Sequence, residues 1–249
     1  MTILQRPLIE YQMEHQGRLV SYSQPAPGIE PATFLRYASG RPRFYWRDGR
    51  TGVTFAGMGI AADLMAWGEA RIGGIQRQAQ ELFAHAVTLH TDDPLAAPRL
   101  FGGFAFREDF VPDYAWVGFN PAHFILPHYQ LVQHDQETWL TINTLLTPDE
   151  SPAANEAQLR EALQQCYDAL LAFASSPPTL AVDSQTKPSH LVTYPMPYDT
   201  WAQMIERAKD QFQTGPLQKV VLARVCEVQL PHLVDLDGAL AYLQRRYAD

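Results

Sequence analysis

The sequence is poor in cysteine, in positive charge and in long apolar runs. Its 249 residues include two cysteines, too few for a disulfide framework, which suits a reducing cytoplasm. No apolar run approaches the ~18 residues that a bilayer crossing needs. Residues 1–16 have no apolar core after a basic start, so we expect no secretory signal. The formal net charge of -8 argues against a general binder of nucleic acids or anionic membranes. We therefore expect a soluble, cytoplasmic globular protein.

Several common catalytic and cofactor motifs are also missing. No Cys-x-x-Cys or His-Glu-x-x-His spacing indicates a zinc site, and there is no Walker loop or Gly-x-Ser-x-Gly elbow. Gly57, Gly59 and Ala62 have the spacing of a dinucleotide-binding turn, but the acidic strand end required roughly twenty residues later is absent. Cys226 lies in an apolar run and is expected to be packed rather than reactive.

Residues 36–50 interleave five arginines with aromatic residues. Such mixtures can bind single-stranded nucleic acid through charge and stacking. The acidic balance of the whole chain favours the alternative, a solvated β-ribbon whose arginines lie over aromatic rings.

What is present is the composition of an ordinary globular protein, 46% hydrophobic and 18% charged. The first expected strands are a hairpin of Arg43–Trp46 and Val53–Phe55. A strand is also expected at Leu100–Phe106, where two adjacent glycines suggest a close backbone approach. The last expected strands are Phe124–Val132 and Thr138–Leu146, which pair with each other. The expected helices are Ile75–Ala86, Leu159–Phe173, Trp201–Phe212, which Gly215-Pro216 ends, and a last one that opens near Asp235 or Asp237. Strands in runs separated by helices in runs predict an α+β fold, with antiparallel sheets and flanking helices.

The segment Ser175–His190 contains three prolines and is predicted to be a boundary. It separates an N-terminal region, residues 1–190, from the start of a second region, residues 191–249. The last helical pattern runs to Asp249 without a stop signal. We interpret this as a fold that is incomplete at the C-terminus.

Lysine is scarce. Of the 19 basic residues, only Lys187, Lys209 and Lys219 are lysines. Lys219 heads the apolar run Lys219–Val228, which is predicted to be a buried strand. A charged amine that enters a buried strand costs several kcal/mol unless it is paired or loses its proton. A deprotonated lysine can act as a general base on water. The alternative is a strand-end lysine that extends to solvent, and the residues alone favour it because such lysines are common.

The stretch Leu217–Val225 (LQKVVLARV), preceded by the expected Trp201–Phe212 helix, resembles the opening of the chorismate-binding core of isochorismate synthases. Leu100–Phe106 (LFGGFAF) and Phe55–Leu64 (FAGMGIAADL) resemble segments of that family's N-terminal region. The resemblance runs along the whole chain. It implies a fold of antiparallel sheets shared with anthranilate, aminodeoxychorismate and salicylate synthases, and a Mg2+-dependent reaction with chorismate as the substrate.

The resemblance also implies a role for Lys219. In the isochorismate branch the lysine at this position activates water, which adds at C2 of the ring. The C4 hydroxyl leaves with help from a protonated glutamate, and Mg2+ holds the substrate carboxylate. Anthranilate synthases have glutamine at this position and a Leu-Leu-Glu-Ser segment that is missing here. Both differences favour water over ammonia as the nucleophile.

The family's acid and metal-binding glutamates lie C-terminal to the lysine strand, beyond Asp249, so the sequence predicts no metal ligand and assigns neither Glu206 nor Glu227 to these roles. We expect that the chain as given does not turn over chorismate. Two alternatives remain: a salicylate synthase of the same family, and a non-catalytic remnant or binding domain. The residues predict no oligomeric state and do not distinguish menaquinone from siderophore biosynthesis.

Overall fold

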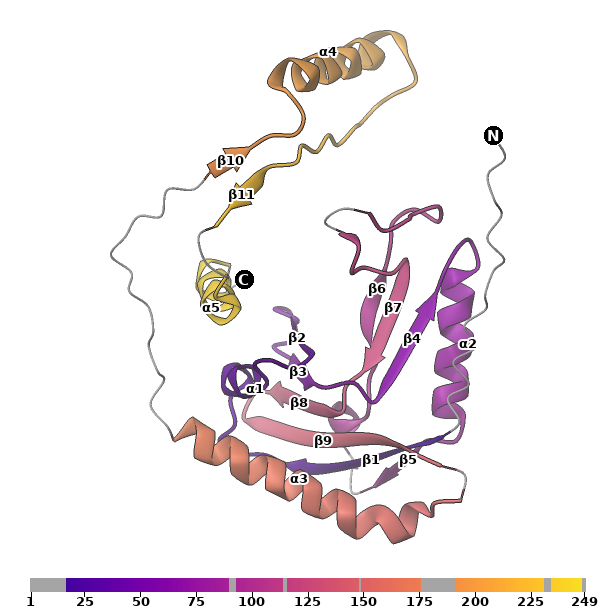
Figure 1. The fold of residues 1–249 in the computed structure, drawn as a ribbon, viewed down its shortest axis with the longest axis vertical. Coiled ribbons are helices and arrows are strands. Elements are labelled where there is room, and N and C mark those ends of the chain that lie inside the picture. The colour runs from indigo at the N-terminus through magenta and orange to yellow at the C-terminus, as the bar shows by residue number, and fades with distance from the viewer. Residues whose placement is uncertain are drawn as a thin grey trace. The chain divides into compact units, whose positions relative to one another are not determined.

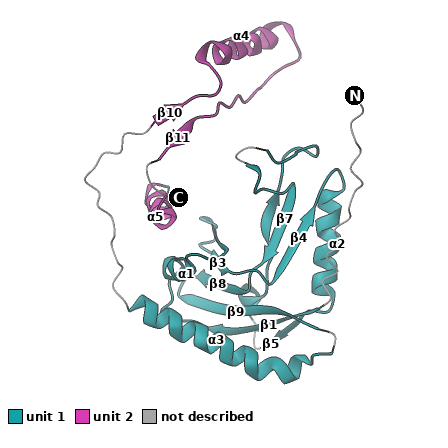
Figure 2. Cartoon of the chain, in the orientation of Figure 1, with its two compact units in different colours: residues 1–177, 247–249 teal, residues 178–246 magenta. Residues whose placement is uncertain are grey.

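The computed structural model describes residues 17–89, 93–113, 116–147, 149–175, 191–230 and 234–247. The chain divides into two compact units (Figure 2): unit 1 is residues 1–177 with 247–249, and unit 2 is residues 178–246. The division falls within the predicted boundary segment, of which residues 176–190 lie outside the described residues. In the described part of the chain, no helix combines the length and apolarity needed to cross a membrane.

Unit 1 is built on a six-stranded sheet in the order β2-β3-β8-β9-β1-β5 (Figure 1). Neighbouring strands are antiparallel except for β1 and β5, which are parallel. The predicted hairpin is confirmed, because Trp46 of β2 pairs with Phe55 of β3. The strands are β1 (Arg18–Pro25), β2 (Arg43–Arg47), β3 (Thr54–Met58), β5 (Val87–Leu89), β8 (Tyr129–His134) and β9 (Glu137–Leu146).

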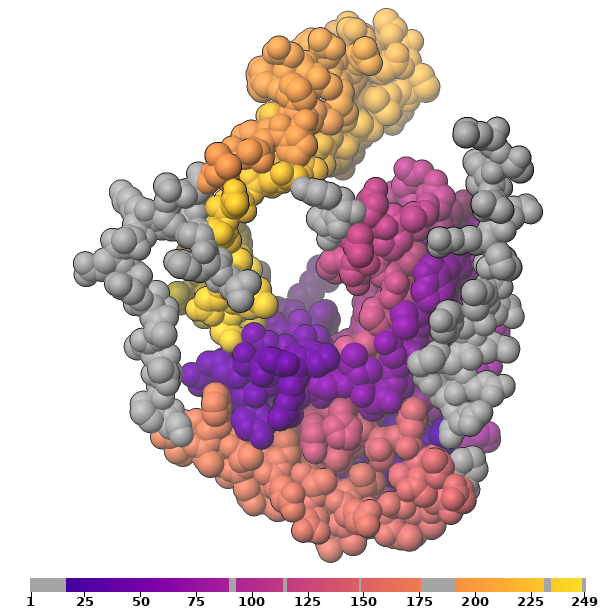
Figure 3. Space-filling model, viewed as in Figure 1, coloured from indigo at the N-terminus to yellow at the C-terminus, as the bar shows by residue number. Residues whose placement is uncertain are grey.

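Two helices pack on this sheet, α1 (Pro31–Tyr37) and α3 (Pro152–Ala174). Pro152 suits the first turn of α3, where a backbone N–H has no helical partner. The predicted apolar stripe of α3 is confirmed and faces inward, since Leu159, Leu163, Cys166 and Leu170 are buried. Figure 3 shows α3 as a continuous layer along one side of unit 1.

Polar side chains are buried between β1, β9 and the short helical turn η1 (Pro94–Ala96). Ser21 Oγ donates to Asn143 Oδ1 at 2.7 Å, and Thr141 Oγ1 donates to the carbonyl oxygen of Ala96 at 3.0 Å. Buried polar groups are tolerated when each has a hydrogen-bond partner. This part of the core is therefore specified by hydrogen bonds as well as by apolar packing.

A second, three-stranded sheet in unit 1 has the order β4-β7-β6. Its strands are β4 (Ala62–Ala66), β6 (Phe101–Phe104) and β7 (Ala122–Leu126), and α2 (Arg71–Ala84) packs on one face. The helix confirms the predicted 3.6-residue pattern from Ile75. A shared apolar core joins α2 to the sheet and includes Leu64, Ile75, Leu82 and Leu126.

The predicted single strand Phe124–Val132 is wrong, because the chain changes sheet at Pro127. Proline has no N–H to donate to a ladder, so β7 ends before it and β8 begins after it. The neighbouring connection from β3 to β4 also changes sheet, at Gly59, whose φ of 71° suits glycine. The N–H of His128 donates to the carbonyl oxygen of Gly59 at 3.3 Å, and Ala61 N–H donates to that of Leu126 at 2.8 Å. The β3–β4 and β7–β8 connections therefore pass from one sheet to the other side by side.

The strand within Leu100–Phe106 is confirmed over Phe101–Phe104, and so is its close backbone approach. A Cβ added at Gly102 would collide with the carbonyl oxygen of His123 on β7. Gly103 has open space around it, so only the first of the two glycines is required by packing.

Unit 2 contains β10 (Leu191–Thr193), α4 (Tyr198–Thr214), β11 (Glu227–Gln229) and α5 (Leu236–Arg246). Both predicted helices are confirmed, and α4 ends at Gly215. The predicted buried strand Lys219–Val228 is wrong: only its last two residues belong to β11, and residues 217–226 are irregular. In the described part of unit 2, β11 pairs only with β10, and a strand buried on both faces needs neighbours that cover it. The described residues have the predicted α+β fold.

Candidate functional site

Lys219 lies in unit 2, between α4 and β11, in the irregular segment that follows Pro216. Its side chain is exposed. The exposed fractions of Val221 and Val225 are 81% and 58%, so the apolar residues near Lys219 do not surround it. The exposed side chain matches the alternative that the residues alone favoured, a lysine that extends to solvent. Its role as a general base stays a prediction.

Arg224 holds this segment in place. Its guanidinium donates from Nε and Nη2 to the carbonyl oxygen of Met196, at 3.1 and 2.9 Å. The same group lies over the ring of Tyr194, with 4.3 Å between Cζ and the ring centroid. Arg224, just before β11, thus contacts Tyr194 and Met196, just after β10.

The two glutamates left unassigned by the sequence have other partners. On α4, Glu206 pairs with Lys209 at 2.8 Å between Oε1 and Nζ, and this hydrogen bond raises the pKa of the lysine. On β11, Glu227 Oε2 accepts from Thr193 Oγ1 at 3.3 Å. Both contacts stabilise local structure.

No cluster of three His, Cys, Asp or Glu side chains suited to a metal ion occurs among the described residues. Mg2+ prefers several oxygen ligands, usually carboxylates with water and substrate oxygens. The described side chains therefore do not form a Mg2+ site by themselves.

The two cysteines have opposite environments. Cys166 is buried on α3, and burial raises the pKa of its thiol to about 11. Cys226 is exposed, so the expectation that it is packed is wrong. The cause is the missing strand, because the run that was expected to bury Cys226 is irregular.

The β-ribbon expected over residues 36–50 forms only in part, because residues 36 and 37 belong to helix α1 and strand β2 begins at Arg43. The expected stacking of arginines on aromatic rings is present before the hairpin. Arg41 lies over the ring of Tyr37, at 5.8 Å from Cζ to centroid, and Arg36 lies over Phe173 at 5.9 Å. Cation–π contacts of this kind occur within about 6 Å. These two guanidinium groups are thus part of the packing between α1 and its neighbours.

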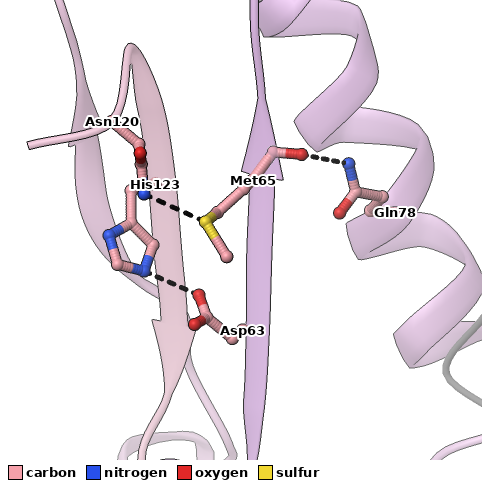
Figure 4. Close-up of polar contacts among 5 residues, drawn as sticks. All are labelled: Asp63, Met65, Gln78, Asn120 and His123. Carbon is pink, nitrogen blue, oxygen red and sulfur yellow. Dashed lines mark hydrogen bonds and ion pairs between the residues drawn. The ribbon is translucent and has the colours of Figure 1, made fainter. Parts of the chain in front are cut away.

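One polar cluster has no counterpart in the sequence predictions (Figure 4). His123 of β7 and Asp63 of β4 form a hydrogen bond, 2.6 Å between Nε2 and Oδ1. Beside them, Asn120 Nδ2 donates to Met65 Sδ at 3.0 Å, and Gln78 donates to the Met65 carbonyl oxygen at 2.9 Å. Asp63 and Met65 alternate with buried residues of β4, a signal that places them on the sheet face away from the α2 core. The pairing itself joins residues 60 positions apart, which no local pattern indicates.

The chain is similar to known proteins. A family model described as "Chorismate binding enzyme" matches residues 5–249. The isochorismate synthase MenF of Bacillus subtilis (strain 168) is 24% identical over 215 residues, which cover 83% of this chain and 43% of that protein. A solved structure of MenF, the menaquinone-specific isochorismate synthase from Escherichia coli, has a TM-score of 0.58 and 19% identity over 92% of this chain and 45% of its own.

The family model spans both units, and the solved structure shares the fold. The chain spans less than half the length of either relative. The resemblance found in the sequence is thus confirmed: this chain belongs to the family of chorismate-binding enzymes.

Proposed function

We propose that this chain forms the N-terminal part of an isochorismate synthase, which converts chorismate to isochorismate with Lys219 as the general base. The observation that supports it is the match of the family model over residues 5–249, which includes Lys219. Both relatives described above are isochorismate synthases. This favours isochorismate over salicylate as the product, and menaquinone biosynthesis over a siderophore pathway.

The proposed chemistry is an isomerisation in which one hydroxyl group replaces another. The Lys219 amine accepts a proton from water as the water oxygen bonds to C2 of the ring. The ring double bonds shift, and the C–O bond at C4 breaks. The departing hydroxyl needs a proton from an acid, which we assign to no residue of this chain. Water is a poor nucleophile at neutral pH, and general bases contribute about 10²–10⁴-fold to such steps.

Mg2+ dependence is part of the proposal through the family resemblance. Among the described residues, no cluster of three His, Cys, Asp or Glu side chains is suited to hold the ion. We propose that the ligands and the acid belong to the part of the relatives' length that this chain does not match. The 249-residue chain alone is then expected to be inactive.

The test measures isochorismate by chromatography after incubation with chorismate and Mg2+. The full chain is mixed with the part of the Bacillus subtilis synthase outside the region of similarity. Lys219→Ala is expected to lower kcat at least 100-fold, since it removes the base. Lys209→Ala is the matched control, because Lys209 is an exposed lysine of the same unit paired with Glu206, and it should leave kcat within twofold. Unchanged turnover by Lys219→Ala would show that the base is another group.

A further inference from the structure

The first backbone N–H groups of helix α2 lack acceptors. Its N-cap residue, Ala70, has no side chain that accepts a hydrogen bond, and the first turn contains no acidic residue. Among the described residues, the N–H groups of Ile72 and Gly73 have no acceptor, and both residues are exposed. Free N–H groups and the positive end of the helix dipole together favour an anion at this place.

A buried guanidinium group lies at the same end of α2. Arg71, the first residue of the helix, is only 7% exposed. Its Nη1 donates to the carbonyl oxygen of Gly68 at 3.2 Å, and its backbone N–H donates to the same oxygen at 3.2 Å. Its Nη2 donates to the carbonyl oxygen of Ala105 at 3.2 Å. The side chain is therefore folded back against the start of its own helix.

The charge of Arg71 has no partner of opposite sign in the described part of the chain. Both of its acceptors are neutral carbonyl oxygens, and no described carboxylate forms an ion pair with it. Glu69, the closest acidic residue in the sequence, is exposed. Arg71 Nε is buried and has no hydrogen-bond partner among the described residues. Since buried charges are normally paired and buried N–H groups normally have acceptors, this end of α2 is suited to an oxyanion.

The second sheet of unit 1 brings these groups together. Ala122 of β7 pairs with Ala66, the last residue of β4, and with Phe104, the last residue of β6. The ends of β4 and β6 therefore lie together where α2 begins (Figure 1). Gly68 turns the chain into the helix with a φ of 70°. A Cβ added at Gly73 would meet no described atom within 4 Å, so a small ion has room beside the first turn.

We propose that the start of α2 binds a small oxyanion, the phosphate or carboxylate group of a ligand. The N–H groups of Ile72 and Gly73 donate to its oxygens. The guanidinium of Arg71 supplies the counter-charge, and Nε is the donor of that group that has no other acceptor. The inference does not depend on the function proposed for Lys219.

The experiment follows backbone amide resonances of the full 249-residue chain by NMR. The chain is titrated with inorganic phosphate and separately with acetate, at constant pH and ionic strength, with chloride as the reference. We expect saturable shifts of the Ile72 and Gly73 amides. The first turn of α4, which contains the carboxylate of Asp199, should not shift. Tighter binding of phosphate than of acetate would indicate a phosphate ligand, and the reverse order a carboxylate ligand.

Two substitutions test the named groups. Gly73→Glu places a carboxylate at the start of the helix and should weaken oxyanion binding about tenfold, because the two negative charges compete for the same helix end. Gly73→Gln is the matched neutral control and should leave the affinity within twofold. Arg71→Met removes the counter-charge and should weaken binding about tenfold, since hydrogen bonds from a charged donor are the stronger ones.

Three results would overturn the inference. The first is a set of Ile72 and Gly73 shifts that do not saturate, or that chloride reproduces. The second is equal affinity of Gly73→Glu and Gly73→Gln. The third is unchanged affinity in folded Arg71→Met. If circular dichroism shows that Arg71→Met does not fold, the two Gly73 variants decide the outcome, because neither changes a buried side chain.

Discussion

Helices α3 and α4 make the clearest comparison between the two units. Both have apolar residues at helical spacing and more than four turns. In unit 1 the stripe of α3 is buried against the six-stranded sheet, whereas no residue of α4 is buried. The difference therefore lies in what each helix packs against.

An amphipathic pattern thus predicts a helix without predicting its burial. Most helical stability in proteins comes from tertiary packing of the apolar face. Unit 1 supplies such a partner, with large side chains such as Phe34 and Leu163 fully buried. The described part of unit 2 supplies no buried partner for α4.

The largest effect is expected when the same substitution is made in both units. Phe34→Ala removes a side chain with 0% exposure and should lower the free energy of unfolding by about 3–5 kcal/mol, since a cavity remains. Phe212→Ala removes a side chain that is 44% exposed and should cost about 1 kcal/mol or less. Urea unfolding followed by circular dichroism measures both. Equal losses would show that unit 2 has a core of its own.

The reactivity of the two cysteines also distinguishes the two units, because each unit contains one. Burial raises the pKa of Cys166 from 9.0 to about 11, so its thiolate fraction at pH 8 falls roughly a hundredfold. Labelling with a thiol reagent should therefore modify Cys226 rapidly and Cys166 at least 100-fold more slowly, as read by mass spectrometry of peptides. Rapid labelling of Cys166 in the folded chain would contradict the packing of α3.

The same thiol makes unit 1 sensitive to alkaline pH. The unfolded thiol ionises near 9.0 and the folded thiol near 11, so ionisation favours the unfolded chain between these values. The stability that depends on Cys166 is complete below pH 9 and is lost as pH rises towards 11. Cys166→Ala should flatten this part of a plot of Tm against pH, whereas Cys226→Ala should not.

A smaller effect is expected from adding one methyl group to unit 1. Gly102→Ala places a Cβ against the backbone of β7 and should cost about 1–3 kcal/mol, the usual range for overpacking. Gly103→Ala meets open space and is the control. Thermal unfolding compares them, and equal Tm values would show that β6 can move away from β7.

The smallest effect on stability is expected from the contacts that Arg224 makes in unit 2. Arg224→Ala removes the hydrogen bonds to Met196 and the stacking on Tyr194, a partly buried contact worth about 0.5–1 kcal/mol. Amide exchange of residues 224–229 should quicken about two- to fivefold. An unchanged rate would mean that the β10–β11 ladder alone orders this segment.

Much of the fold could be predicted from local patterns. The hairpin of β2 and β3, the helices α2, α3, α4 and α5, and the close approach at Gly102 all follow from spacing and turn residues. The strand Phe124–Val132 was wrong because composition does not show which sheet a residue joins, and Pro127 divides it between two. The strand from Lys219 was wrong because a strand depends on neighbours that its own residues do not specify.

The candidate site could be predicted less completely. Lysine scarcity and the run after Gly215 singled out Lys219, and the family match supports the resemblance on which its role depends. Its burial could not be judged from the run alone, since exposure is decided by what covers a strand. The pair of Asp63 with His123 was missed because it depends on the register of β4 with β7.

The most direct test of the central claim is isochorismate formation by the full chain, alone and with the complementary part of the Bacillus subtilis synthase. Each sample is incubated with chorismate and Mg2+, and the products are separated by chromatography. We expect no isochorismate from the chain alone and isochorismate from the mixture, with a loss of at least 100-fold for Lys219→Ala. Isochorismate formed by the 249-residue chain alone would contradict it.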